Sequence, residues 1–179
     1  RQGVHEDEFA VGRPRFEEVG ALFSDRVGDW EQYKLRLLNG THTCMAYLSA
    51  LAGVVYVDEA IATPPLRRFL ERFLFDEAIP TLEEIPGHPR EEYATTVLAR
   101  FGSTGIRDQV ARICIDGTAK VPTFVVPTIE AQLERDGPVE CAALALAGWA
   151  RYLATTPPAE RAPDSSAEQS TSYARRSLD

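Results

Sequence analysis

Residues 31–53 have the sequence EQYKLRLLNGTHTCMAYLSALAG, and this stretch predicts one long helix around which the rest of the chain is organised. Strong helix formers such as Leu, Arg, Ala and Met dominate it. Asp29 can cap the beginning of this helix, and Gly53 stands where a helix commonly ends. We therefore expect an unbroken helix between residue 31 and Gly53.

One face of this helix carries four polar side chains. At about 100° per residue they fall within an arc of about 140°, and they are Glu31, Lys34, Asn39 and His42. An acid, an amine, an amide and an imidazole among apolar neighbours are typical of the wall of a site. Spacing alone leaves a structural alternative open, in which Glu31 and Lys34 form an ordinary ion pair and His42 is a satisfied core histidine.

Length and charge restrict the class of protein. The chain has 179 residues, a formal net charge of −8 and a pI near 5.0. This length predicts a single domain that buries about 70% of the surface of its unfolded chain. The acidic balance, without a basic run, argues against nucleic acid and against an anionic membrane as partners. No stretch approaches the roughly 18 consecutive apolar residues of a membrane span.

The three cysteines, Cys44, Cys114 and Cys141, are far apart and lie in apolar segments. An odd number in such positions predicts reduced thiols in a core, and not a disulfide or zinc framework, so we expect a cytoplasmic protein. The acidic patch at residues 5–8 is typical of solvated surface, because neighbouring side chains do not point to one centre. We expect no metal site.

The remaining segments predict an all-α protein. After a strand fragment at 54–57, turn residues separate the expected helices, which span residues 58–62, 64–78, 89–101, 106–115, 128–135 and 139–155. The last of these is apolar nearly all round, which predicts central burial. We expect an irregular lead-in between domains at 1–26, a helical substrate-binding domain at 27–156 and a mobile tail at 157–179.

The segment KLRLLNGTHT, with the spacing Lys-x4-Asn-x2-His, resembles the signature helix of the polyol-specific long-chain dehydrogenases, the family of mannitol 2-dehydrogenase and of the fructuronate and tagaturonate reductases. The resemblance covers roughly residues 6–154. It continues in the same order through GRPRFEEVGALFSDRVGDWEQYK, YLSALAG, ARFGSTGIRDQVARICIDGTAKVP and AALALAGWARYL. It implies a multi-helix C-terminal domain similar to the 6-phosphogluconate dehydrogenase C-terminal-like fold. The N-terminal nucleotide-binding domain that precedes it in the family is absent from this sequence.

The resemblance also implies catalytic roles for three residues. Lys34 matches the general base, and a lysine acts as a base when burial penalises its ammonium form. Asn39 would donate its amide to the developing oxygen, and His42 would orient the substrate or the lysine. Glu31, one turn before Lys34, could hold a polyol hydroxyl or pass the proton outward.

Arg112 and Lys120 match substrate-contacting positions of the mannitol branch. Lys34 and Lys120 are also the only lysines of the chain, and arginine supplies all other positive charge. A lysine in a chain that otherwise uses arginine for positive charge indicates that its titratable amine or its shape is needed at that position. The alternative is that Lys120 is merely exposed beside a turn.

The function implied by the resemblance is the substrate-binding and catalytic-base half of an NAD- or NADP-dependent polyol dehydrogenase. It would interconvert a sugar alcohol such as mannitol and a ketose such as fructose, with the cofactor held mainly by the absent N-terminal domain, so the isolated fragment would be inactive. Two alternatives remain: a fructuronate or tagaturonate reductase domain, and a free-standing helical binding or oligomerisation module. Where relatives carry Phe-x-Asn-Pro, this chain has residues 101–104, FGST, which puts its substrate specificity in question.

Overall fold

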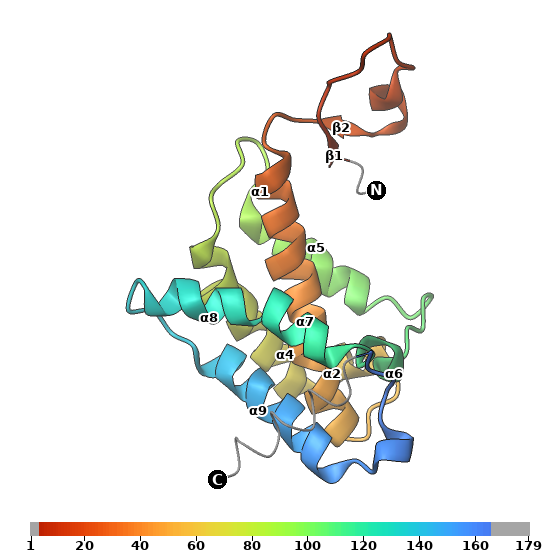
Figure 1. Cartoon of the computed structure of the whole chain (residues 1–179), viewed down its shortest axis with the longest axis vertical. Coiled ribbons are helices and arrows are strands. Elements are labelled where there is room, and N and C mark those ends of the chain that lie inside the picture. The colour runs from red at the N-terminus through yellow and green to blue at the C-terminus, as the bar shows by residue number, and fades with distance from the viewer. Residues whose placement is uncertain (1–3, 166–179) are drawn as a thin grey trace.

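The computed structural model describes residues 4–165, and they form a helical body with a small two-stranded extension at its N-terminal end (Figure 1). Within the described part, the elements in chain order are β1 (Val4–His5), η1 (Phe16–Val19), β2 (Leu22–Phe23), α1 (Val27–Gln32), η2 (Tyr33–Gly40), α2 (Thr41–Leu51), α3 (Val57–Ala62), α4 (Pro64–Arg72), η3 (Phe73–Ala78), η4 (Ile79–Thr81), α5 (Arg90–Phe101), α6 (Val110–Ile113), α7 (Gly117–Phe124), α8 (Val126–Leu133), α9 (Glu140–Thr155) and η5 (Pro158–Glu160). The predicted all-α class is confirmed.

The central helix is formed by α1, η2 and α2, which follow one another without a break. It begins earlier than the sequence suggested, because Arg26 occupies the N-cap position. Asp29 lies instead in the first turn, where its carboxylate accepts a hydrogen bond from Nε of Arg26 at 2.6 Å. The predicted end is confirmed, since Gly53 has a φ of +72°, a conformation that favours glycine.

The middle of the central helix, η2, is a π-helix. In a π-helix the backbone hydrogen bond runs from residue i to residue i+5, and such segments are frequent at functional sites. Lys34 and Asn39 are five residues apart, which is the spacing of that hydrogen bond, so their side chains lie closer to one face than they would in an α-helix. The arc of about 140° that was calculated for an α-helix is therefore larger than the angle between the side chains of Lys34 and Asn39.

Gly40 brings α7 close to the central helix. A Cβ atom at this position would stand 2.9 Å from the backbone oxygen of Phe124, the last residue of α7. In Figure 1, α7 and α8 cross the central helix near its middle. A side chain larger than hydrogen would push α7, which carries Lys120, away from the helix that carries Lys34.

On its other side α2 packs along α9. The two helices approach closely where Gly148 faces Leu48, because a Cβ on Gly148 would be 2.7 Å from Cδ2 of Leu48. The buried carboxylate of Glu77 holds the beginning of α9 by accepting hydrogen bonds from the backbone amides of Cys141 and Ala142, at 2.6 and 2.8 Å. The predicted central burial of α9 was wrong in part, because Leu144 on this helix is 49% exposed.

Two predicted segments differ from the structure. The helix expected at 106–115 is reduced to α6, since residues 102–109 form a loop. Residues 117–124 form α7, a helix that was not predicted, and Pro122 lies inside it. A proline inside a helix costs one backbone hydrogen bond, and here the surrounding packing offsets that cost.

The chain ends are partly fixed to the helical body. Residues 157–165, which the sequence assigned to a mobile tail, form hydrogen bonds from the amide of Asp116 to the oxygen of Pro163 and from the amide of Ala162 to the hydroxyl of Tyr152. The rest of the expected tail, residues 166–179, lies outside the described residues. Within residues 4–165 the three cysteines are buried and unpaired, as predicted, and the helices fall short of what a bilayer crossing requires.

Candidate functional site

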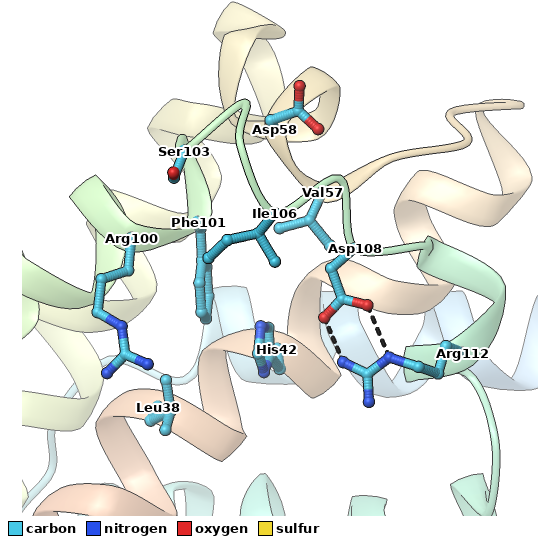
Figure 2. A pocket seen from close by; sticks show the side chains of 10 residues that line it. All are labelled: Leu38, His42, Val57, Asp58, Arg100, Phe101, Ser103, Ile106, Asp108 and Arg112. Carbon is cyan, nitrogen blue, oxygen red and sulfur yellow. Dashed lines mark hydrogen bonds and ion pairs between the residues drawn. The ribbon is translucent and has the colours of Figure 1, made fainter. Parts of the chain in front are cut away.

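A cavity of about 240 Å³ lies beside the central helix, at the junction of α2, α3, the end of α5 and the loop that leads to α6 (Figure 2). It is open to solvent on one side. Its walls combine apolar side chains with histidine, aspartate and arginine, and they are formed by Leu38, His42, Val57, Asp58, Arg100, Phe101, Ser103, Ile106, Asp108 and Arg112. Two of the residues predicted from the sequence, His42 and Arg112, are therefore brought together here.

His42 lies flat against the ring of Phe101. The ring centroids are 3.9 Å apart and the planes are inclined by 6°. Burial lowers the pKa of His42 to about 4, with Asp108 opposing the shift and the positive charges of Arg112 and Lys120 adding to it. The imidazole is therefore neutral near pH 7, and it offers one hydrogen-bond donor and one acceptor.

Arg112 is fixed by a carboxylate that the sequence analysis did not single out. Nε of Arg112 donates to Oδ1 of Asp108 at 2.6 Å, and Nη2 donates to Oδ2, so the pair is bidentate. The guanidinium holds the pKa of Asp108 below its usual value. The i, i+4 spacing of the two residues was the available signal, because it places such side chains on one helical face.

Lys120, the other predicted substrate contact, lies close to this cavity without lining it. Its ammonium donates a hydrogen bond to the backbone oxygen of Ile113 at 3.2 Å, and the side chain is half-buried in α7. The alternative that Lys120 is merely exposed beside a turn is therefore wrong. Its charge contributes to the lowered pKa of His42, which indicates that the two side chains are close.

Lys34, Asn39 and Glu31 lie on the central helix and do not line the cavity around His42. Lys34 and Glu31 are exposed, and neither has an ion-pair or hydrogen-bond partner among residues 4–165. The alternative of an ordinary Glu31–Lys34 ion pair is thus not observed. Asn39 is half-buried and its backbone oxygen accepts a hydrogen bond from Oγ1 of Thr43 at 2.9 Å. The catalytic roles of Lys34 and Asn39 stay predictions.

Several residues of the cavity escaped the sequence analysis. Asp58 comes from α3, and Ser103 and Ile106 come from the loop at 102–109. Their segments meet the central helix only in the folded chain, so no spacing in the sequence indicates them. Ser103 belongs to the FGST segment, where the resemblance led us to expect Phe-x-Asn-Pro. Phe101 and Ser103 of this segment line the cavity.

The described residues offer no metal site and no nucleotide-binding loop. Histidine, cysteine and carboxylate side chains within residues 4–165 do not gather in groups of three that could hold a metal ion. The β1–β2 pair of the same region is followed by no glycine-rich turn into a helix, which dinucleotide binding requires.

Comparison with known proteins identifies relatives in one family. Residues 26–175 match the family described as the mannitol dehydrogenase C-terminal domain. Mannitol dehydrogenase 2 of Saccharomyces cerevisiae is 44% identical over 153 residues, which are 85% of this chain and 30% of that protein. Mannitol 2-dehydrogenase of Phaeosphaeria nodorum is 40% identical over 155 residues, which are 85% of this chain and 27% of that protein. The chain thus spans about 30% of the length of these relatives.

Solved structures with a similar fold come from the same group of enzymes. The mannitol 2-dehydrogenase of Pseudomonas fluorescens, solved as a ternary complex with NAD and D-mannitol, has a TM-score of 0.86 and 36% identity. The alignment covers 96% of this chain and 35% of that one. A substrate-free D-sorbitol dehydrogenase has a TM-score of 0.83 and 32% identity, with 93% of this chain and 34% of that one covered.

Proposed function

The chain belongs to the mannitol dehydrogenase family, whose C-terminal domain it matches, and on this premise we propose that it is the substrate-binding and catalytic-base domain of an NAD-dependent polyol dehydrogenase. One observation carries the proposal. Lys34 presents an exposed amine that has no ion-pair partner among residues 4–165, and it lies five residues before Asn39 on the helix whose His42 lines the cavity together with Arg112. The substrate would be a sugar alcohol such as mannitol and the product a ketose such as fructose.

Lys34 would remove the hydroxyl proton of the alcohol. This requires a neutral amine, and the exposed position of Lys34 in this domain leaves room for a second domain to cover it. Burial under such a domain would favour the neutral form, because desolvation penalises an ammonium ion. The unpaired state of Lys34 supports this role, since no carboxylate among the described residues stabilises its charge.

Asn39, His42 and Arg112 would hold the reacting carbon and its neighbours. An amide donor aimed at the developing oxygen stabilises it by about 3 kcal/mol in other enzymes. The neutral imidazole of His42 can accept from one hydroxyl and donate to another, and its stack on Phe101 fixes the ring. Arg112 and Lys120 would extend hydrogen bonds along the sugar chain. Glu31, also exposed, would hold a hydroxyl or pass the proton to solvent.

The dinucleotide would be held by an N-terminal domain outside this chain. When bound there, NAD would supply the hydride acceptor. Support for NAD comes from the Pseudomonas relative, which was solved with NAD and D-mannitol. This chain would place the alcohol and its proton acceptor at the surface that the nucleotide-binding domain covers.

A substrate panel on the complete protein tests the proposal. D-mannitol and D-sorbitol would be offered with NAD and with NADP, and D-fructose and D-fructuronate with the reduced cofactors, while absorbance of the reduced cofactor is followed. We expect turnover of a polyol–ketose pair with NAD. Turnover of fructuronate alone would select the reductase alternative and reject the proposed substrate.

A further inference from the structure

Asp58 is an acid of the His42 cavity, and one of its carboxylate oxygens lacks a hydrogen-bond partner among residues 4–165. The residue is 9% exposed, and its Oδ1 is buried without a hydrogen-bond partner among the described residues. An unpaired buried acceptor destabilises a protein, and native structures contain few of them, so each one calls for an explanation. Asp58 also lines the cavity, at the edge that it shares with Ser103 (Figure 2).

The arginines nearby form no ion pair with Asp58 among the described residues. Arg107 attracts the carboxylate of Asp58 at longer range, while its guanidinium lies 3.7 Å over the Tyr56 ring and 3.7 Å from the carboxylate of Glu59. Arg112 is engaged by Asp108 in the bidentate pair. Neither arginine therefore supplies the hydrogen bond that Oδ1 of Asp58 lacks.

Two charged groups of opposite sign on the cavity wall form no ion pair among residues 4–165. One is the buried carboxylate of Asp58, and the other is the exposed guanidinium of Arg100, which has no ion pair among residues 4–165. A ligand that satisfies both must donate a hydrogen bond at one point and accept one at another. A chain of hydroxyl groups does this without adding charge, whereas a carboxylate would meet repulsion from Asp58.

We propose that Asp58 is a specificity-determining residue, which accepts a hydrogen bond from a hydroxyl of an uncharged polyol or ketose and repels the carboxylate of a sugar acid. This inference rests on the proposed function and deepens it, because it assigns to one residue the choice between polyol and uronate. Discrimination of this kind commonly combines an attractive contact for one ligand with a repulsive one for its competitor.

The test is the ratio of kcat/KM for D-fructose to that for D-fructuronate, measured on the complete enzyme before and after Asp58→Asn. Loss of a hydrogen bond to a charged group should lower kcat/KM for fructose about tenfold, mainly through KM. Removal of the negative charge should raise kcat/KM for fructuronate, so the ratio should fall by more than tenfold. Glu130→Gln is the control, because it removes an exposed carboxylate on α8, outside the cavity, that has no ion pair among residues 4–165, and it should leave the ratio unchanged.

Arg100→Gln provides a second variant at an exposed position, where folding is not at risk. It should shift the same ratio in the opposite direction, because the cavity loses the cation that attracts a carboxylate. An unchanged ratio in Asp58→Asn would overturn the role of Asp58, whatever the result for Arg100→Gln. A wild-type enzyme that prefers fructuronate would overturn both this inference and the proposed substrate.

Discussion

The imidazole of His42 and the ring of Phe101 lie parallel, 3.9 Å between centroids, although they come from helices that are far apart in the sequence. This contact fixes the plane of the imidazole, and burial at the same place keeps it neutral. The end of α5 therefore determines how the signature helix presents its histidine.

Replacing Lys34 by Ala in the complete enzyme should lower kcat for polyol oxidation at least about a hundredfold, since general-base catalysis contributes on that scale. The side chain is exposed and unpaired in this domain, so the melting temperature should stay close to that of the wild type. Steady-state kinetics and thermal unfolding followed by circular dichroism measure the two effects. Arg68→Ala, at an exposed site on α4, is the control. Unchanged kcat in the Lys34 variant would remove the amine from the mechanism.

Protonation of His42 should make stability depend on pH. Its pKa in the folded protein is about 4, against 6.5 for an unperturbed histidine, so the unfolded chain binds the proton more tightly. The contribution of His42 is therefore complete above pH 6.5 and is lost as the pH falls toward 4. His42→Phe can keep a ring against Phe101 without titrating. Between pH 6.5 and about 4, the free energy of unfolding of this variant, measured with urea, should decline less than that of the wild type. If the two proteins lost stability equally over this pH range, the lowered pKa of His42 would be contradicted.

Asp108 should act as a positioning residue for Arg112. In Asp108→Asn the guanidinium loses its bidentate partner, so KM for the polyol should rise roughly three- to tenfold while kcat changes little. Asp108→Glu, which retains the charge, should recover part of the loss. Initial rates over a range of polyol concentrations separate KM from kcat. A fall in kcat with an unaltered KM would indicate a different role.

Gly40→Ala should destabilise the domain, because the new Cβ would stand 2.9 Å from the oxygen of Phe124. Overpacking of this kind costs about 1–3 kcal/mol. Gly28→Ala is the matched control on the same helix, since a Cβ there meets nothing within 4 Å, and it should stabilise slightly. Urea unfolding of both variants compares them. Equal free energies of unfolding for the two variants would show that α7 moves away from the new methyl group without loss of stability.

The sequence predicted the helical class and most helix positions, since these depend on local periodicity and on caps and breakers. The end at Gly53 and the helices at 90–101 and 140–155 agree with the structure within a residue or two. It missed α7, a short helix that contains Pro122, because a proline inside a helix removes a backbone hydrogen bond and only the packing of neighbouring elements offsets that loss. The sequence did not indicate that η2 is a π-helix, because the arc of the polar face was calculated with the α-helical period of about 100° per residue.

The candidate site, too, could be predicted only in part from the sequence. The sequence by itself determined which side chains share the central helix, because Lys34, Asn39 and His42 are joined by a short stretch of backbone with a regular period. Only the tertiary structure decided that Phe101, Asp58 and Asp108 surround His42 and Arg112 in one cavity. The physical reason is that these contacts arise from helices packed across long sequence separations, where burial and charge, rather than spacing along the chain, determine which side chains meet.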